Sequence, residues 1–469
     1  MLRNPNSFTM SRKIPSGLLG FTGKGVCIGI VDSGMDIYSA AFRNEDGSTR
    51  IAWFWDQTYE SSFEGRVYSQ DEINEILVNE RQNLNFDQTG HGTAVGGIAG
   101  GYMPIFDENG RENLTESVIG VAVECTFIVV KLGIVRKRDF PRTTQIMRAV
   151  NFCILKAREL QMPLVINLSF GNTYGNHLGN TLFEEYLNNA SLVWKTAIVV
   201  GSGNEADSYG HIAMKLERDR ARNIELSVSN YETALSIQLW CMWQVRFRLF
   251  LEAPSGEVIT IDTNTYGFQR YRLGATTLAI WVGEPSPYEL EREIYMDFIP
   301  IGNYIDPGIW TIRIVPLEER NEQIRLYLPS SRARNEETRF IISTPELTLT
   351  VPSPANRLIT VGAYNEATNA YAPFSGRGEN GRVQKPELCA NGVRVKSVGF
   401  YNRKEYFTGT SFAAPFITGI AALLMEYGIV NGNDPFLYGA KLKAQLIRLA
   451  TPLPGERIVP NEKTGYGKI

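Results

Sequence analysis

Two different periodicities divide this chain of 469 residues. From Gly25 to about Gly210, short apolar segments alternate with segments whose apolar residues recur at helical spacing. The segments VCIGIVDSG, ECTFIVVKLG, PLVINLSFG and SLVWKTAIVVGSGN are typical of buried strands, and TTQIMRAVNFCILKARELQ and GNTLFEEYLNNA of helices between them. This alternation predicts an α/β fold with a mostly parallel sheet and helices on both faces.

The pattern changes after His211. From about Asn223 to Thr350 the chain reads as about ten short β-runs separated by turn signals, such as those at Pro254 and Asp306, which is typical of a β-sandwich or jelly roll. The α/β pattern resumes at Arg357. We therefore expect a discontinuous α/β domain, residues 1–211 and 351–469, interrupted by an inserted β-sandwich (jelly roll) at residues 212–350.

Composition excludes several classes of function. Apolar residues make up 43% of the chain and charged residues 21%, and the formal net charge is −3, which is ordinary for a folded protein and gives no reason to expect nucleic acid or an anionic membrane as a partner. The first residues lack the apolar core of a secretory signal, so we expect an intracellular protein, cytoplasmic or spore-associated. The five cysteines form no CxxC pair and indicate neither a disulfide framework nor a zinc site.

Three residues with catalytic chemistry stand at strand ends or helix starts of the α/β part. Asp32 follows a buried strand, His91 lies in TGHGTAVGGIAGG, and Ser411 opens an apolar helical run in GTSFAAP. Each has an ordinary structural alternative. Asp32 could form a turn, His91 could be a histidine whose hydrogen bonds are satisfied at a helix start, and Ser411 could be a helix cap or a small packing residue. Their order along the chain, Asp, His, Ser, is that of subtilisin, and the G-x-S-x-G elbow of α/β-hydrolases is absent.

The motifs around these residues resemble those of the subtilases, the subtilisin-like serine proteases. They are VDSGMD around Asp32, GHGTAVGGIAGG around His91, INLSFG around Ser169, VVGSGNEA around Asn204 and GTSFAAP around Ser411. TRIAWFWDQT, DEINEIL, GNTYGNH and the long insert between Asn204 and Ser411 are similar to the Csp-type germination proteases of spore-forming bacteria.

This resemblance implies a serine endopeptidase that hydrolyses a protein or peptide substrate through an acyl-enzyme. It leaves two substrate roles open: limited proteolysis of a zymogen in spore germination, and general turnover of intracellular protein. It assigns the nucleophile to Ser411, the general base to His91, the orienting carboxylate to Asp32 and the oxyanion hole to Asn204. It also implies two substrate-binding segments, formed by Lys131, Leu132, Gly133, Ser169, Phe170 and Gly171.

The resemblance leaves several points open. Only 31 residues precede Asp32, so a removed or separate propeptide, common among subtilases, remains open. We expect no cofactor for the chemistry and no metal at His177 or His211, while a structural calcium ion cannot be read from the sequence. The alternative function is a catalytically silent subtilase-fold regulator or a binding scaffold. The presence of all three catalytic residue types together with Asn204 argues for the enzyme.

Overall fold

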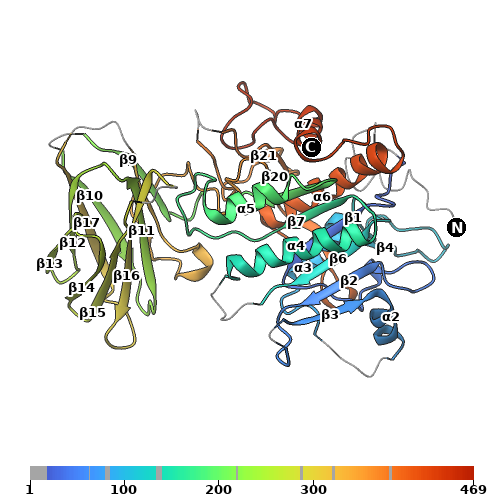
Figure 1. Ribbon diagram of the computed structural model, residues 1–469, viewed down its shortest axis with the longest axis horizontal. Coiled ribbons are helices and arrows are strands. Elements are labelled where there is room, and N and C mark those ends of the chain that lie inside the picture. Colours follow the sequence, from blue (N-terminus) through green and yellow to red (C-terminus); the bar gives the residue numbers. More distant parts are fainter. Residues whose placement is uncertain are drawn as a thin grey trace. The chain divides into compact units, whose positions relative to one another are not determined.

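The computed structural model describes residues 18, 20–62, 64–79, 85–133, 140–217, 220–285, 289–318, 323–379 and 383–469. The chain divides into two compact units (Figure 1). The first comprises Met1–Gly171, Leu182–Gly203 and Pro352–Ile469, and the second comprises Asn172–Thr181 and Asn204–Val351. A β-rich unit thus interrupts the α/β unit in sequence, and it also includes a short segment that the sequence alone did not separate from its surroundings.

A nine-stranded sheet forms the centre of the first unit. Its order is β21-β20-β8-β7-β1-β6-β2-β3, with β22 also paired to β20. All neighbours from β20 to β2 are parallel, whereas β3 and β21 pair antiparallel at the two ends, so the predicted mostly parallel sheet is confirmed. The strands are β1 (Cys27–Asp32), β2 (Ile51–Asp56), β3 (Arg66–Ser69), β6 (Thr126–Lys131), β7 (Leu164–Leu168), β8 (Thr196–Gly201), β20 (Ile359–Asn365), β21 (Ala370–Tyr371) and β22 (Leu388–Asn391).

Helices cover both faces of this sheet. On one face, α3 (His91–Gly100) and α6 (Thr410–Met425) pack together over Ile28 and Ile30 of β1. On the other, α4 (Thr143–Glu159) lies so close to β1 that a Cβ on Gly29 would stand 3.2 Å from the Cys153 sulfur, and α5 (Leu182–Ala190) packs beside α4. Small residues therefore set the spacing between helix and sheet.

Helix α6 continues into the π-helical turn η5 (Glu426–Val430). Within the described residues, Thr410–Val430 is one helix that is long and apolar enough to cross a membrane, but 83% of its most apolar 18-residue window is buried inside the protein. Its position under the sheet accounts for its apolar composition. The Glu426 carboxylate at its end accepts hydrogen bonds from the backbone N–H groups of Thr22 and Gly23, which ties the N-terminal segment to this core.

Smaller elements complete the first unit. The acidic segment DEINEIL lies in α2 (Gln70–Val78), which begins with a capping box: Ser69 Oγ accepts from the Glu72 N–H, and the Glu72 carboxylate accepts from the Ser69 N–H. The remaining elements are η2 (Ala40–Phe42), β4 (Tyr102–Met103), β5 (Val118–Ile119), β23 (Val395–Val398), η4 (Phe400–Asn402), β24 (Lys404–Phe407) and α7 (Gly439–Leu449). All five cysteines of the chain are buried free thiols.

The second unit is built from two antiparallel sheets. Their orders are β13-β12-β17-β10-β19 and β14-β15-β16-β11-β18-β9. The strands are β9 (His211–Lys215), β10 (Arg222–Val228), β11 (Leu235–Met242), β12 (Phe247–Glu252), β13 (Val258–Ile261), β14 (Gly267–Leu273), β15 (Thr276–Val282), β16 (Glu291–Pro300), β17 (Gly308–Pro316), β18 (Gln323–Tyr327) and β19 (Arg339–Phe340); η3 (Ser331–Ala333) follows β18. Inward side chains of both sheets, such as Leu249 and Ile312 from one and Leu239 and Met296 from the other, share one core, so the unit is a β-sandwich.

The segment Asn172–Thr181 adds a strip to this sandwich. Asn172 pairs with Val351, Thr173 Oγ1 donates to the Leu328 carbonyl, and the Gly175 N–H donates to Gln238. The second unit therefore includes Asn172–Thr181, and its main part begins at Asn204; the sequence boundaries placed both this segment and residues 204–211 in the α/β domain. Hydrogen bonds between residues far apart in sequence, which no local pattern encodes, make this assignment.

Candidate active site

Asp32 ends the strand β1, which lies between β6 and β7 near the middle of the sheet. Carboxyl ends of parallel strands are where open α/β sheets place their functional groups. The carboxylate is completely buried, and its Oδ1 accepts a hydrogen bond from the Ser33 N–H at 2.7 Å. The same oxygen lies 2.7 Å from His91 Nδ1. A carboxylate in this position fixes the imidazole orientation and favours the tautomer with its proton on Nδ1.

His91 is the first residue of α3 and follows Gly90, whose φ of 76° lies in the left-handed region. Its side chain is 20% exposed, so the ring meets both the buried carboxylate and the solvent side of the site. The helix approaches the turn after β1 so closely that a Cβ on the next residue, Gly92, would stand 2.0 Å from the Gly34 carbonyl oxygen. The glycines around His91 therefore bring the imidazole to Asp32.

A second buried carboxylate, Asp87, holds the start of this helix. One of its oxygens accepts from Ser33 Oγ at 2.8 Å and from the Gly90 N–H at 2.9 Å. The other accepts from the N–H of Thr93 at 2.9 Å and from its hydroxyl at 2.6 Å. Since these donors lie on both sides of His91, Asp87 fixes the loop that enters α3 and also its first turn.

Ser411 is the second residue of α6, in the first turn, where backbone N–H groups have no acceptor inside the helix. Its Oγ donates to the Ser169 carbonyl at 3.3 Å, and Ser169 Oγ donates to the Ser411 carbonyl at 3.0 Å. Asn167, buried in β7, donates to Ser169 Oγ at 2.8 Å and accepts from Thr418 of α6 at 2.9 Å. These bonds join the helix that carries Ser411 to the end of β7.

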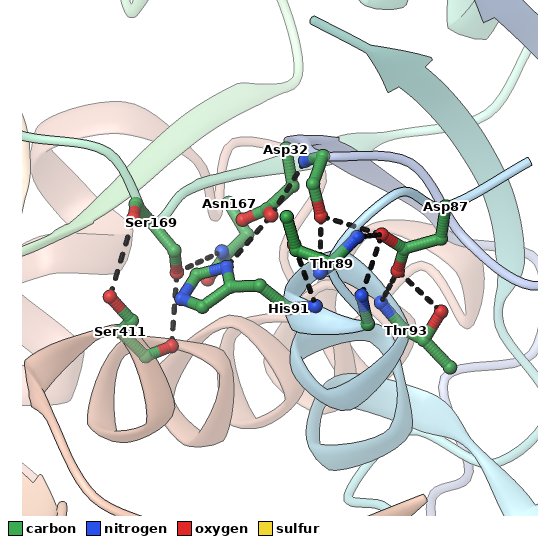
Figure 2. A network of polar contacts seen from close by, with 11 residues as sticks. Asp32, Asp87, Thr89, His91, Thr93, Asn167, Ser169 and Ser411 are labelled. Atoms are coloured by element: carbon green, nitrogen blue, oxygen red, sulfur yellow. Dashed lines mark hydrogen bonds and ion pairs between the residues drawn. The ribbon is translucent and has the colours of Figure 1, made fainter. Parts of the chain in front are cut away.

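Figure 2 shows the imidazole of His91 with one edge towards Asp32 and the other towards Ser169 and Ser411. The His91 ring also contacts Phe412, the residue after Ser411, with 5.2 Å between ring centroids. Residues from β1, α3 and α6 that are up to 379 positions apart in sequence, since 411 − 32 = 379, thus meet at one place. A carboxylate, an imidazole and a hydroxyl at a helix start are the parts that nucleophilic acyl transfer requires.

The segment that leads to Asn204 is anchored to Thr410, the residue before Ser411. The Gly203 N–H donates to Thr410 Oγ1 at 3.1 Å, and a Cβ on Gly201 would stand 3.1 Å from the Thr410 backbone. Asn204 follows directly in sequence and is half-buried. Its role as an oxyanion-hole donor stays a prediction.

The two segments predicted to bind substrate differ in what they expose. The Lys131 side chain is buried and pairs with Asp56 at 3.1 Å, and the Leu132 side chain is buried too. The Lys131 carbonyl already accepts from the Gln57 N–H, directly after β2, and the Leu132 N–H donates to the Asp32 carbonyl of β1. Of this segment, Gly133 is the residue left half-exposed. Ser169, Phe170 and Gly171 are all half-exposed, beside Ser411.

Sequence reasoning missed Asp87 and Asn167. Each carried a signal: Asp87 starts a D-Q-T-G turn just before a helix, and Asn167 is a polar residue inside an otherwise apolar strand. A buried polar residue needs a partner, and here the partners belong to the site. Among the residues that the structure describes, no group of three or more His, Cys, Asp or Glu side chains could hold a metal ion.

Comparisons with known proteins agree with this geometry. The model of the subtilase family matches residues 23–246 and 331–467. The CspB protease of Clostridium perfringens superposes with a TM-score of 0.88 and is 30% identical, over 98% of this chain and 95% of that one. The subtilase-type proteinase RRT12 of Saccharomyces cerevisiae is 35% identical over 80 residues, which are 17% of this chain and 15% of the length of that relative. The chain belongs to the subtilase family of serine endopeptidases, and within that family it resembles the Csp-type protease.

Proposed function

We infer that this protein hydrolyses peptide bonds with Ser411 as nucleophile, His91 as general base and Asp32 as the orienting carboxylate. The observation that carries the proposal is the 2.7 Å contact between Asp32 and His91 Nδ1, made on a ring that also contacts the start of the Ser411 helix. A serine hydroxyl is a weak nucleophile at neutral pH, so it needs a base that is already oriented. The buried carboxylate supplies that orientation.

The reaction consists of two acyl transfers. Ser411 Oγ attacks the substrate carbonyl carbon while the imidazole of His91 takes its proton. The C–N bond then breaks, and the imidazolium gives the proton to the leaving amine. Water, activated by the same base, releases the acid from the acyl-enzyme and restores the serine. The oxyanion of each tetrahedral intermediate is assigned to the Ser411 N–H and the Asn204 amide, and in subtilisin itself loss of the asparagine costs about 10²–10³ in kcat.

A narrower role is supported by the likeness to the CspB protease over nearly the whole of both chains. The role is limited cleavage of a protein zymogen in spore germination, inside the cell or spore, without a cofactor in the chemistry. The half-exposed segment Ser169–Gly171 beside Ser411 suits an extended peptide strand, because such a segment can offer backbone groups for pairing. The same proposal includes a propeptide as a partner, either removed from this chain or supplied as a separate chain.

Labelling with a fluorophosphonate probe tests the catalytic assignment. The native chain should form an adduct on the peptide that contains Ser411, as located by mass spectrometry, and Ser411→Ala should not. Ser255→Ala, at an exposed turn of the second unit, is the matched serine control and should be labelled like the native chain. If folded native protein fails to react while a control protease reacts, the peptidase proposal is wrong and a silent regulator takes its place.

A further inference from the structure

The hairpin formed by β23 and β24 has an unusual tip. Tyr401 and Asn402 are consecutive residues with φ of 56° and 58°, in the left-handed region that bulky side chains rarely adopt. Tyr401 is also 85% exposed, so burial of its own ring does not explain the conformation. Residues held in a strained conformation gather at functional sites, which makes this tip a candidate for a function.

Contacts of the neighbouring residues hold the tip in place. Asn402 Oδ1 accepts hydrogen bonds from the Ser39 hydroxyl and the Ala40 N–H, both at 2.9 Å. Within the turn, the Gly399 N–H donates to the Arg403 carbonyl at 2.7 Å. The tip is therefore fixed to the body of the first unit, and the Tyr401 side chain is held out towards solvent rather than exposed by fraying.

The tip adjoins the catalytic histidine. The Phe400 ring lies against Gly90, the residue before His91, and a Cβ on Gly90 would stand 2.9 Å from Phe400 Cε2. The other arm, β24, leads through two residues into α6, and its Phe407 stacks on Phe412 with 5.0 Å between centroids. The hairpin thus lies beside the site and contacts the histidine loop, whereas Ser169 contacts Ser411.

The proposed reaction indicates which part of the substrate lies beside His91 and which part lies beside Ser169. His91 gives its proton to the leaving amine, so the part of the substrate that follows the cleaved bond begins at the imidazole. An extended peptide advances about 3.3 Å per residue, so its first few residues after the bond pass the structures next to His91. The half-exposed segment Ser169–Gly171 remains for the part that precedes the bond.

We propose that Tyr401 is a specificity residue, and that the hairpin tip binds an apolar or aromatic side chain in the first few substrate residues after the cleaved bond. This inference rests on the proposed peptidase function. A tyrosine offers a large apolar face and, with two side-chain torsions, loses little conformational entropy on binding, which suits contact with such a side chain. The strained backbone presents the ring in advance of binding.

Two measurements test the proposal. Internally quenched peptides share the residues before the bond and carry leucine, phenylalanine or serine at each of the three positions after it. Tyr401→Ala should lower kcat/KM about tenfold, mainly through KM, for the peptides with leucine or phenylalanine, and should leave the serine peptides unchanged. Tyr401→Phe should retain the preference. The control is Tyr231→Ala, which removes a tyrosine that is 71% exposed at a φ of 66° in the second unit.

Binding to inactive protein separates this proposal from the peptidase proposal. In a Ser411→Ala background, fluorescence anisotropy of the same peptides should show about tenfold weaker binding when Tyr401→Ala is added. Labelling by the fluorophosphonate, which lacks residues after the bond, should not change in Tyr401→Ala alone. Equal affinity and equal kcat/KM for all peptides in native protein and Tyr401→Ala overturn the specificity role, whereas absence of labelling in the native chain overturns the catalytic one.

Discussion

The three histidines of this chain occupy two contrasting environments. His91 in the α/β unit is 20% exposed and lies 2.7 Å from a carboxylate. His177 and His211 in the sandwich are buried, and both stack on the ring of Tyr327, with centroid distances of 3.9 Å and 4.4 Å. A histidine that must gain and lose a proton needs a partner charge and access to water, whereas a histidine that packs a core needs neither.

The electrostatics of the sandwich pair follow from this difference. Burial lowers the pKa of His177 to about 4, although the carbonyls of Leu349 and Thr173 that face its ring nitrogens act in the opposite direction. Burial lowers the pKa of His211 to about 3, against the effect of its bond to the Thr344 carbonyl. Both rings are therefore neutral at pH 7 and serve as aromatic packing residues.

The largest expected effect comes from removing the charge beside His91. Asp32→Asn keeps the shape of the side chain but favours the wrong imidazole tautomer, so kcat should fall about 10⁴-fold. Circular dichroism should show an unchanged fold. A steady-state assay with a good peptide substrate measures the loss, and a decrease below tenfold would remove Asp32 from the mechanism.

The next effect tests whether Asp87 acts through His91. Asp87→Ala removes the acceptor for Ser33, Gly90 and Thr93, which should displace the start of α3 and lower kcat about 10²-fold. Asp87→Asn keeps part of the network and should recover part of the rate, with KM little changed. If Asp87→Ala lowers stability but leaves kcat intact, the residue supports the fold alone.

The lowered pKa of His211 in the sandwich predicts that the stability of the protein depends on pH. The unfolded His211 takes up a proton near pH 6.5, but the folded one does so only near pH 3, so its contribution to stability is present above pH 6.5 and is lost as the pH falls below it. The loss is about 1.4 kcal/mol for each pH unit, or about 2 kcal/mol between pH 6.5 and pH 5.

His211→Asn isolates this term, because asparagine can still donate to the Thr344 carbonyl but does not titrate. The free energy of urea unfolding should fall more steeply in the native chain than in the variant from pH 6.5 to pH 5. The difference between the two chains cancels the opposing contribution of Glu293, whose carboxyl pKa burial raises to about 7. Parallel pH profiles would show that folding does not lower the pKa of His211.

The comparison also shows which features the sequence could reveal. The parallel sheet, its helices and the sandwich have strong local periodicity, and Asp32, His91 and Ser411 stand in short motifs at strand ends and helix starts. The inclusion of Asn172–Thr181 in the sandwich depends on bonds to Gln238 and Leu328, which are distant in sequence. The burial of Lys131 likewise depends on Asp56, a residue of the neighbouring strand.

The smallest expected effect comes from a substitution that removes the hydroxyl of Tyr327 but keeps its ring. The hydroxyl donates to the Leu347 carbonyl at 3.2 Å, while the ring carries the contacts with His177 and His211. Tyr327→Phe should therefore cost about 1 kcal/mol of unfolding free energy, because one buried carbonyl loses a donor, and this cost should be equal at pH 7 and pH 5. Urea unfolding at both pH values measures it. A cost that is larger at pH 5 than at pH 7 would mean that the hydroxyl, rather than burial, keeps the two imidazoles neutral.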